Sequence, residues 1–582
     1  MNVLGISCFY HDSAACLIKD GDITGAVSEE RFNRQKYSPD FPINAINFCL
    51  QAGNLTIYDI DYIGFYEKPF LKFYRVILSH LQDYPSSLRN FLDTMPNWLQ
   101  DRLAIPLVFK KELGFGRKVL FIKHHLSHAA SAFLVSPFEE AAILTADGVG
   151  EWANMSYGIG KGNDVKIFKE MQFPDSLGLL YTAVTTYLGF EALKGEGKVM
   201  GLAGYGKPIF IDKFREIVTM KSDGSYRIDQ RFFRFNKGYR MYSKKFVKMF
   251  GKERKPTDKI DQRHCDIAAS LQKFIEDVLI IIATSLYNDI KMDKLCLAGG
   301  LFLNCVANSK IIEATRFKEV FIQPAAGDSG GALGVASYIY HTLLKNPRNY
   351  VMNNAYLGPD FSPNQIKRIL INSKLDFKEF NDSDLAKYIA EKISQNKIVG
   401  WFQGKMEFGP RALGNRSILA NPCNPDMRGL LNSKVKKRDS FMPYAPAALE
   451  ERVTEFFTSK QFSPFMLLSA RVKEDKRTII PAVTHIDGTA RVQTVNKNTN
   501  AKFWYLIKEF ENITGVPVIL NTSFNLKGEP IVCTPQDAID TFLESQMDLL
   551  VLGNFVLEER SLASSHFLKS KKDEKNFNNN PL

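Results

Sequence analysis

The first thirty residues alternate short apolar runs with turn residues, a pattern that predicts antiparallel strands. The apolar runs cover residues 3–7, 14–19 and 23–28. The last two runs are separated by Asp20-Gly21-Asp22, and an Asp-Gly pair between apolar runs favours a tight hairpin turn. The chain is therefore expected to begin as a three-stranded antiparallel unit.

Buried strands that end in glycines recur farther along the chain. Residues 266–289 have helical periodicity and lead into the apolar run 294–298, which ends in two glycines. A second apolar run, 319–322, leads through a glycine-rich segment to another helix. Strands that end in glycines before helices place backbone N–H groups where phosphates bind. The pattern predicts an α/β fold with anion-binding loops.

A turn-rich stretch divides the chain. Residues 345–363 contain Pro, Gly and Asn without long apolar periodicity, which predicts a linker. The α/β alternation resumes near residue 364, and the polar, asparagine-rich C-terminus predicts a disordered tail. The expected organisation is a first domain over residues 1–350, a second over 364–534, a segment at about 535–560 that packs back on the first domain, and a tail over 566–582.

The composition is that of a folded protein: of 582 residues, 45% are hydrophobic and 24% are charged. A chain of this length divides into roughly three or four structural units. Its eight cysteines form no Cys-x-x-Cys pair, which argues against a zinc ribbon or a disulfide scaffold. The N-terminus lacks a signal-peptide pattern, and apolar runs such as residues 278–283 are too short to span a bilayer, so the cytoplasm is the expected location.

The formal net charge of +12 raises the question of nucleic-acid binding. No RNA or DNA recognition motif accompanies the basic residues, so no nucleic-acid partner is expected. An enzyme that handles anions such as phosphates accounts equally well for the charge.

Two histidines four residues apart give the first sign of a metal site. His124 and His128 are followed by small residues that favour a helix, on which this spacing places both imidazoles on one face. About twenty residues later, a buried-strand pattern ends at Asp147, a carboxylate that could reach the same place. Two histidines and an aspartate predict iron or a similar divalent metal, whereas an isolated pair of this spacing is more often filler in a core or on a surface.

Two further segments of the first half carry polar groups near turns. His11 and Asp12 follow the first strand, where the imidazole serves either as a general base or only as a hydrogen-bond partner of the turn. Residues 196–207 combine glycines with two lysines, which suits phosphate or an anionic substrate. The spacing in this segment is not that of a Walker loop.

The second half carries an arginine-rich set of polar residues. Arginines bind phosphate through two parallel hydrogen bonds, so the set predicts a phosphorylated ligand. A solvated basic face is the weaker alternative, because glycines and a proline are interleaved with the arginines. The set consists of Arg411, Arg416, Lys436, Arg438, Arg491, Asn521 and Ser523.

The sequence resembles the O-carbamoyltransferases of nodulation-factor and antibiotic biosynthesis, which include tobramycin and cephamycin tailoring enzymes. The resemblance spans residues 1–560 and rests on several long motifs that are highly specific in combination. The motifs are GISCFYHDSAACL, SEERF, HHLSHAASAF, DGVGEW, EGKVMGLAGYGKP, AGGLFLNCVAN, AAGDSGGALG, FGPRALGNRSIL and NTSFNLKGEPIV.

The resemblance implies an actin-like N-terminal lobe, made of two ribonuclease-H-like halves, joined to an α/β C-terminal lobe similar to threonylcarbamoyl-adenylate synthase. The predicted order of strand, anion loop and hairpin agrees with such a beginning. The resemblance also implies that carbamoyl phosphate and ATP yield carbamoyl-adenylate in the C-terminal lobe. The N-terminal lobe would then transfer the carbamoyl group to a hydroxyl of a sugar, glycan or natural product.

The resemblance further implies roles for individual residues. The metal, Fe(II) or a similar divalent ion, would be held by His124, His128, Asp147 and Asp328, with His125 only a neighbour. His11 would assist deprotonation of the acceptor hydroxyl. Contacts to ATP, with Mg²⁺, would come from Gly148, Lys198, Gly201, Gly300 and Asn304. Contacts to carbamoyl phosphate and the adenylate would come from Arg411, Arg416, Lys436, Arg491, Asn521 and Ser523.

Two other functions are left open by the sequence. One is a fused enzyme that forms threonylcarbamoyl-adenosine on tRNA from threonine and bicarbonate, and the other is a non-catalytic actin-like nucleotide-binding scaffold. The chain lacks an RNA motif, and a scaffold does not explain the arginine-rich second half. The acceptor and the oligomeric state stay open. The aromatic-rich segment 65–118 either lines the acceptor pocket or is a helical cover packed on its own core.

Overall fold

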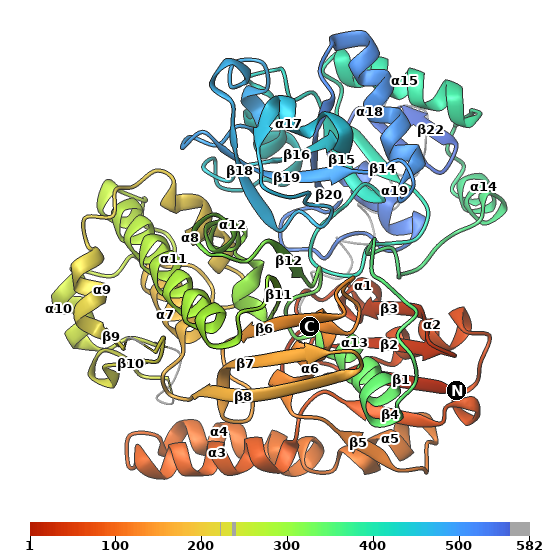
Figure 1. Cartoon of the computed structure of the whole chain (residues 1–582). Helices are drawn as coiled ribbons and strands as arrows, with labels where there is room; N and C mark the ends of the chain where they lie inside the picture. The colour runs from red at the N-terminus through yellow and green to blue at the C-terminus, as the bar shows by residue number, and fades with distance from the viewer. Residues whose placement is uncertain (222, 236–239, 559–582) are drawn as a thin grey trace, which may run out of the picture.

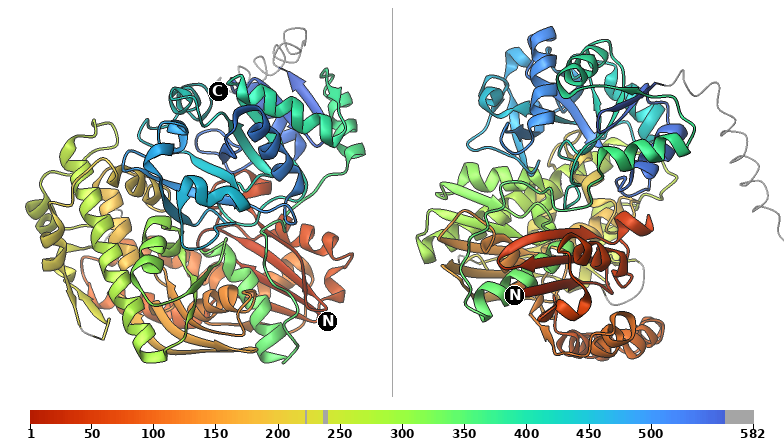
Figure 2. Two further views of the ribbon diagram at one scale, coloured as in Figure 1. Left: turned by 45° about the horizontal axis from the view of Figure 1, so that its top comes forward. Right: turned by 90° about the vertical axis from the view of Figure 1, so that its right-hand side faces the viewer.

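The structure is a computed structural model that describes residues 1–221, 223–235 and 240–558. An N-terminal lobe holds two five-stranded sheets, and a C-terminal lobe with a ten-stranded sheet lies above it (Figures 1 and 2). The stretch predicted as a linker contains no helix or strand between residues 344 and 362. The expected tail at 566–582 lies outside the described residues. Within the described ranges, none of the helices has the length and apolar character needed to cross a membrane.

The two sheets of the N-terminal lobe repeat one strand order. In the first sheet β1, β2 and β3 are antiparallel neighbours, and β4 and β5 continue in parallel on the other side of β1. In the second, β6, β7 and β8 are antiparallel, and β11 and β12 continue in parallel beyond β6. This repeated order confirms the actin-like lobe with two ribonuclease-H-like halves. The strands are β1 (Asn2–Ser7), β2 (Ala14–Lys19), β3 (Asp22–Ser28), β4 (Tyr62–Phe65), β5 (Val119–Phe121), β6 (Glu140–Ala146), β7 (Ala153–Lys161), β8 (Asp164–Gln172), β11 (Lys294–Ala298) and β12 (Glu319–Ile322).

Helices cover the two sheets and fill the space between them. Helix α13 packs on β1 and on α6, and α6 packs on β6 and β11, so these two helices join the halves of the lobe. The aromatic-rich segment contains α3, α4 and α5, and α3 and α4 run along the lower edge of the lobe in Figure 1. The elements are α1 (Glu30–Asn33), α2 (Ile43–Ala52), α3 (Pro69–Gln82), α4 (Leu88–Asn97), α5 (Ile105–Leu113), α6 (His124–Phe133), α7 (Leu177–Tyr187), α8 (Glu196–Ala203), α9 (Ile211–Ile217), β9 (Val218–Met220), β10 (Tyr226–Ile228), α10 (Lys244–Phe250), α11 (Gln262–Ile290), α12 (Cys305–Ala314) and α13 (Ser329–Ser337).

The contact between α13 and its neighbours depends on glycine. A Cβ atom added to Gly334 would lie 1.9 Å from the carbonyl oxygen of Ser127 in α6. A Cβ atom added to Gly5 in β1 would lie 2.0 Å from the carbonyl oxygen of Ala332 in α13. The main chains of α6, α13 and β1 therefore touch directly, with no side chain between them.

The C-terminal lobe is built on one mixed sheet with the strand order β13-β22-β21-β14-β15-β20-β16-β19-β18-β17. A second apolar core, separate from that of the N-terminal lobe, lies between this sheet and its helices. The elements are α14 (Pro363–Asn372), β13 (Lys378–Glu379), α15 (Asp382–Ser394), β14 (Val399–Phe402), β15 (Arg416–Ala420), α16 (Met427–Leu430), β16 (Ala445–Leu449), α17 (Val453–Phe456), β17 (Phe457–Thr458), β18 (Leu468–Val472), β19 (Thr489–Val495), α18 (Ala501–Thr514), β20 (Val518–Ser523), α19 (Pro535–Glu544), β21 (Leu549–Leu552) and β22 (Phe555–Glu558).

The segment at about 535–560 adds two strands to the C-terminal sheet, and near its start Oδ1 of Asp537 lies 4.0 Å from Nε of Arg34 in the N-terminal lobe. Strand β21 pairs in parallel with β14, and β22 pairs with β21, so the segment completes the C-terminal sheet. The apolar run of β21 in the sequence indicates a strand buried on both faces, and does not indicate which sheet buries it.

The glycine-rich segment 196–207 is largely helical. Its first eight residues form α8, which packs on α11. The carboxylate of Glu196 accepts hydrogen bonds from the Thr182 hydroxyl at 2.9 Å and the Leu193 N–H at 3.0 Å. These tertiary contacts outweigh the low helix propensity of glycine, which costs about 1 kcal/mol per residue.

Direct hydrogen bonds hold the two lobes together. The Arg31 side chain donates to the Gly409 carbonyl at 2.8 Å, and that of Arg34 donates to the Ile531 carbonyl at 2.7 Å. On another side of the interface, the Asn308 amide donates to the Leu467 carbonyl at 3.0 Å. The lobes therefore meet along an extended polar seam.

The glycine contact predicts a large effect of a small substitution. Gly334→Ala is expected to destabilise the N-terminal lobe by about 3 kcal/mol or more, because α13 and α6 would have to separate. The control is Gly429→Ala in α16, where an added Cβ meets nothing within 4 Å and the expected change is within about 1 kcal/mol. Calorimetric melting of both variants checks this, and equal melting temperatures would contradict it.

Candidate functional site

Four side chains from three parts of the N-terminal lobe meet at one point. Their ligand atoms, one from each of His124, His128, Asp147 and Asp328, all lie within 4.8 Å of one another. The two histidines stand one turn apart at the start of α6, Asp147 follows β6, and Asp328 directly precedes α13. Both carboxylates thus follow the carboxyl ends of parallel strands of the second sheet, β6 and β12, and the close packing of α13 on α6 brings Asp328 to the histidines.

The geometry of this cluster fits a divalent metal. The Nε2 atom of His124 lies 3.1 Å from both the Nε2 of His128 and the Oδ2 of Asp147. Each of these nitrogens is 3.6 Å from Oδ1 of Asp328, an oxygen that is buried without a hydrogen-bond partner among the described residues. Two imidazole nitrogens and two carboxylate oxygens are a donor set for iron, zinc or a similar ion.

Electrostatics support the same interpretation. Burial opposes the charge of Asp147, but hydrogen bonds from His124 and His128 hold the pKa of this carboxyl well below its usual range. Burial lowers the pKa of His128, and the two carboxylates outweigh this and raise it to about 9. The buried carboxylates therefore require positive charge beside them, supplied by protons or by a metal ion.

His11 lies next to this cluster. Its Nδ1 is 3.0 Å from Oδ2 of Asp12, and its Nε2 is 3.8 Å from Oδ2 of Asp328. Burial lowers the pKa of His11, whereas the charge of Asp328 and the bond to Asp12 raise it to about 10. A cation beside Asp328 would oppose the effect of that carboxylate.

The neighbouring His125 points away from the cluster. Its Nδ1 lies 2.6 Å from the Thr145 hydroxyl, which is itself 2.6 Å from the Ser156 hydroxyl. The sequence interpretation of His125 as a neighbour agrees with this orientation. Gly300 also borders the cluster, because its N–H donates to Oδ1 of Asp147 at 3.2 Å.

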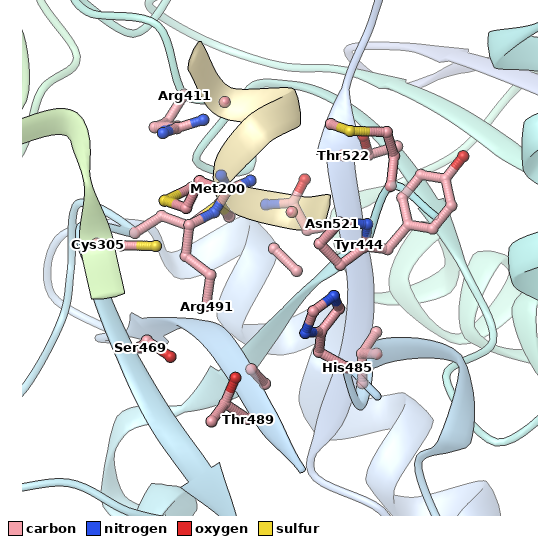
Figure 3. A pocket seen from close by; sticks show the side chains of 18 of the residues that line it. Met200, Cys305, Arg411, Tyr444, Ser469, His485, Thr489, Arg491, Asn521 and Thr522 are labelled. Carbon is pink, nitrogen blue, oxygen red and sulfur yellow. The ribbon is translucent and has the colours of Figure 1, made fainter. Parts of the chain in front are cut away.

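A second site lies between the lobes. This pocket is bounded by α8 and the start of α12 on the N-terminal side and by loops and strands of the C-terminal lobe on the other. Figure 3 shows Arg411, Arg491 and Asn521 around this space. Its lining residues include Gly197, Met200, Gly201, Cys305, Val306, Arg411, Ala412, Arg438, Tyr444, Ser469, His485, Thr489, Arg491, Asn521, Thr522 and Ser523.

The pocket wall carries more positive than negative charge, because Arg411, Arg438 and Arg491 line it together with one carboxylate, that of Asp487. The Nε atoms of Arg411 and Arg491 are buried and have no hydrogen-bond partner within the described ranges. Burial, followed by the nearby charge of Arg411, lowers the pKa of Arg491 to about 9. Two desolvated guanidiniums of like charge favour an anionic ligand such as phosphate.

Two residues of the predicted anion set have other positions. Arg416 is fully buried, donates to the carbonyls of Gly404 at 3.1 Å and Pro359 at 3.0 Å, and stacks 3.6 Å above the Phe402 ring. It supports the fold and is not among the residues that line the pocket, so the structure does not bring it together with Arg411 and Arg491. The alternation of glycine and arginine in the sequence does not show which guanidinium points inward.

Lys436 stands behind the pocket wall. Its ammonium group contacts the carbonyl and hydroxyl of Ser523 and lies 2.8 Å from Oδ1 of Asn525. Burial, and then the charge of Arg438, lower its pKa well below the usual range. Lys436 therefore orders the turn that presents Ser523.

The residues predicted to bind nucleotide divide between the two sites. Gly148 and Gly300 border the metal-ligand cluster, whereas Gly201 lines the interlobe pocket. Lys198 pairs with Asp439 of the other lobe at 2.9 Å. Asn304 caps α12 and donates to the Gln272 side chain at 2.9 Å. Its side-chain amide is therefore already hydrogen-bonded within the N-terminal lobe.

Several polar residues of the pocket were not predicted from the sequence, among them His485 and Tyr444. His485 comes from the turn before β19, and Tyr444 comes from the start of β16. A lone histidine or tyrosine between polar loops carries no spacing signal. Only the Asp487 that follows His485 by two residues, and lies 3.2 Å from its Nδ1, could have indicated a positioned imidazole.

One short turn connects the two sites. The 3₁₀ turn η4 (Gly300–Leu303) begins at the N–H that bonds Asp147 and ends at the Leu303 carbonyl, which accepts a hydrogen bond from Arg411 at 3.3 Å. Four residues of such a turn rise about 8 Å. The metal-ligand cluster and the interlobe pocket therefore lie close to each other.

The fold and the paired sites define a two-lobed α/β transferase. The chain belongs to the carbamoyltransferase family: the model described as "Carbamoyltransferase N-terminus" matches residues 2–337, and that described as "Carbamoyltransferase C-terminus" matches residues 390–559. This confirms the resemblance found in the sequence and makes the protein a carbamoyltransferase. The second match includes β21 and β22, in agreement with their place in the C-terminal sheet.

Relatives match over nearly the whole chain. An uncharacterized protein of Synechocystis sp. is 44% identical, with 96% of each chain covered. Nodulation protein NolNO of Sinorhizobium fredii is 38% identical, with 95% of this chain and 80% of that protein covered. A solved structure, component A of the Acidaminococcus fermentans (R)-2-hydroxyglutaryl-CoA dehydratase, covers 58% of this chain and 97% of its own at 13% identity, with a TM-score of 0.31. That score is too low to support an argument, so the fold assignment rests on the strand order.

The histidine cluster predicts a pH-dependent metal affinity. Because a metal must displace the proton of His128, whose pKa is about 9, affinity should rise as pH rises from 6 toward 9, by about tenfold per pH unit for each proton displaced. Titration of metal-stripped protein with Fe(II) or Zn²⁺ at several pH values measures this. His128→Ala should lose binding while His125→Asn keeps it, and equal loss in both variants would contradict the ligand assignment.

Proposed function

We propose that this carbamoyltransferase works in two steps, with ATP as co-substrate. In the interlobe pocket, carbamoyl phosphate, ATP and water would yield carbamoyl-adenylate, phosphate and pyrophosphate. At the cluster of His124, His128, Asp147 and Asp328, the carbamoyl group would pass to an acceptor hydroxyl with release of AMP. The observation that carries this proposal is an anion-binding pocket joined through η4 to a metal-ligand cluster.

The first step is supported by the charge of the pocket. Arg411 and Arg491 offer guanidinium donors from different strands and loops, and Ser523 and Arg438 border the same space. Phosphate oxygens of carbamoyl phosphate and ATP would neutralise this wall. Adenylation is chemically useful because AMP leaves a carbonyl more readily than phosphate does when the nucleophile is a weak alcohol.

The second step is supported by the position of His11. Asp12 holds its Nδ1, which directs Nε2 toward Asp328 and the cluster. Nε2 is the atom that would take the proton from the acceptor hydroxyl as the new O–C bond forms. A divalent metal in the cluster, proposed to be Fe(II) or a similar ion, supplies Lewis-acid polarisation of a carbonyl or phosphoryl oxygen.

The acceptor is proposed to be a hydroxyl-bearing small molecule or glycan. This rests on the family resemblance, and the printed name of the Sinorhizobium relative links that protein to nodulation. The helical segment that includes α3 is tied to the cluster, because Glu151 accepts hydrogen bonds from the N–H groups of both Lys68, at 2.8 Å, and His124, at 3.0 Å. An acceptor that contacts α3 would therefore lie near His11.

The proposal predicts a specific substrate requirement. Purified protein should release pyrophosphate from ATP when carbamoyl phosphate is present, and should carry label from carbamoyl phosphate into an acceptor hydroxyl. ATP with threonine and bicarbonate should give neither result. Pyrophosphate release with threonine and bicarbonate alone would favour the tRNA-modifying alternative, and no carbamoyl-phosphate-dependent release at all would favour the scaffold.

Separate sites predict separable losses. His124→Ala or Asp328→Ala should abolish transfer but retain carbamoyl-phosphate-dependent pyrophosphate release. Arg411→Ala or Arg491→Ala should lower that release by about 100-fold or more, because a desolvated phosphate loses a charged partner. With carbamoyl-adenylate supplied directly, the Arg411 variant should still carbamoylate the acceptor and His11→Ala should not. Equal loss of both half-reactions in every variant would contradict two sites.

A further inference from the structure

Helix α3 exposes apolar side chains and buries polar ones. Its large exposed hydrophobic side chains are Phe70, Leu71, Tyr74 and Leu81. The buried side chains of the helix are Pro69, Lys72, Arg75, Ser79 and His80. A surface helix of a globular protein normally has the opposite arrangement, with its apolar stripe toward the core. The outer face of α3 is therefore not explained by packing within the lobe.

Polar contacts fix α3 in this orientation. The Lys72 ammonium group contacts the Glu67 carboxylate and lies 4.6 Å from the centre of the Tyr10 ring. About one turn farther along, the Arg75 guanidinium lies 5.1 Å from the centre of the Phe173 ring. A rotation of the helix that buried its apolar side chains would break these contacts, so the apolar face stays outward.

Helix α4 and the turn that follows it pack antiparallel to α3. The contact includes two ring pairs, each with centroids 5.5 Å apart: Phe73 with Trp98, and His80 with Phe91. On both segments, exposed apolar side chains recur about a quarter turn away from these rings, and the antiparallel direction brings the two sets to the same side. The contributions of the second segment are Leu88, Leu92 and Leu99.

Together these side chains form one outer apolar face. It consists of Phe70, Tyr74, Leu81, Leu88, Leu92 and Leu99. Figures 1 and 2 place α3 and α4 on the side of the N-terminal lobe that is away from the C-terminal lobe. A contiguous exposed apolar patch on a folded protein marks a surface that meets a partner or a membrane.

Basic side chains predominate beside this face. Helix α5, which packs on the turn after α4, adds two exposed lysines. Within residues 66–118 the exposed cations are Lys68, Arg89, Lys110, Lys111, Arg117 and Lys118, and the exposed carboxylates whose side chains the structure describes are Asp93 and Glu112. Arg102 and Asp83, both half-buried, add one charge of each sign. The surroundings of the outer apolar face are therefore positively charged.

We propose that the outer apolar face docks this protein on an anionic lipid surface. Its leucines and aromatic rings would enter the boundary between headgroups and acyl chains, and the surrounding lysines and arginines would lie beside lipid phosphates and carboxylates. A second copy in two-fold contact is a poorer complement, because it would bring the same cations together. The interlobe pocket lies on the opposite side of the lobe and stays accessible from water.

The test is co-sedimentation of the full chain with lipid vesicles. Wild-type protein should bind vesicles of phosphatidylcholine mixed with phosphatidylserine, and the binding should weaken as salt is added. Vesicles of phosphatidylcholine alone should bind at least about tenfold less well, because each basic residue near an anionic surface adds about fivefold.

One pair of variants tests the apolar side chains. Leu81→Gln with Leu92→Gln changes two side chains that are 65% and 61% exposed, and should weaken binding about tenfold or more because two anchors no longer enter the lipid. The matched control is Ile371→Gln with Ile513→Gln, at exposed positions of α14 and α18 in the C-terminal lobe. The control protein should bind as wild type does.

A second pair tests the charge. Lys110→Gln with Lys111→Gln should weaken binding to the mixed vesicles about tenfold or more and should make it less sensitive to salt. Its control is Lys374→Gln with Lys387→Gln, at two exposed lysines of the C-terminal lobe, and should bind as wild type does.

Several outcomes would overturn the proposal. Wild-type protein that does not bind the mixed vesicles, or binds phosphatidylcholine alone equally well, overturns it without any variant. Unchanged binding by the Lys110 and Lys111 variant also overturns it, even if the leucine variant does not fold. A wild-type dimer in light scattering that the leucine variant converts to a monomer, without vesicle binding, would assign the face to a second copy instead. Vesicle binding needs no substrate, so none of these results bears on the two-step reaction.

Discussion

The main-chain contact between α13 and α6 is the constraint on which the N-terminal site depends. Gly334 lets α13 approach the Ser127 carbonyl, and both helices begin at residues of the metal-ligand cluster. The separation of Asp328 from His124 is therefore set by two backbones in contact. Side chains between these helices could repack and let the distance vary, whereas touching main chains cannot. The same contact joins the two halves of the lobe, so it determines both the fold of the lobe and the geometry of the cluster.

The two sites bury charged groups of opposite sign. In the N-terminal cluster, buried carboxylates need a cation, and in the interlobe pocket, buried guanidiniums need an anion. Each imbalance would be costly in an empty protein interior, since a buried charge without a partner is destabilising. The proposed reaction, with a phosphorylated acyl donor and a metal-assisted transfer, would need these two environments within a short distance.

Much of the fold and part of the site could be predicted from the sequence. Apolar runs marked β1, β6 and β11, and the spacing of His124 and His128 indicated the cluster, because helical geometry alone brings those two together. The repeat of strand order had no counterpart in sequence, since two sheets can share a topology without sharing residues. Arg411 and Arg491 point into the pocket, whereas Arg416 is buried in the fold. This difference depends on tertiary packing, which the local spacing of residues does not reveal.

The single turn η4 between the cluster and the pocket has a consequence for reaction kinetics. The connection between the two sites is short and rigid. A compound released at one site is therefore present at the other at an effective concentration far above the millimolar values that flexible linkers provide. In the proposed two-step reaction, a reactive acyl compound formed at one site would reach the other before it meets much water. Dilution of the protein leaves this advantage unchanged, because both sites belong to one chain.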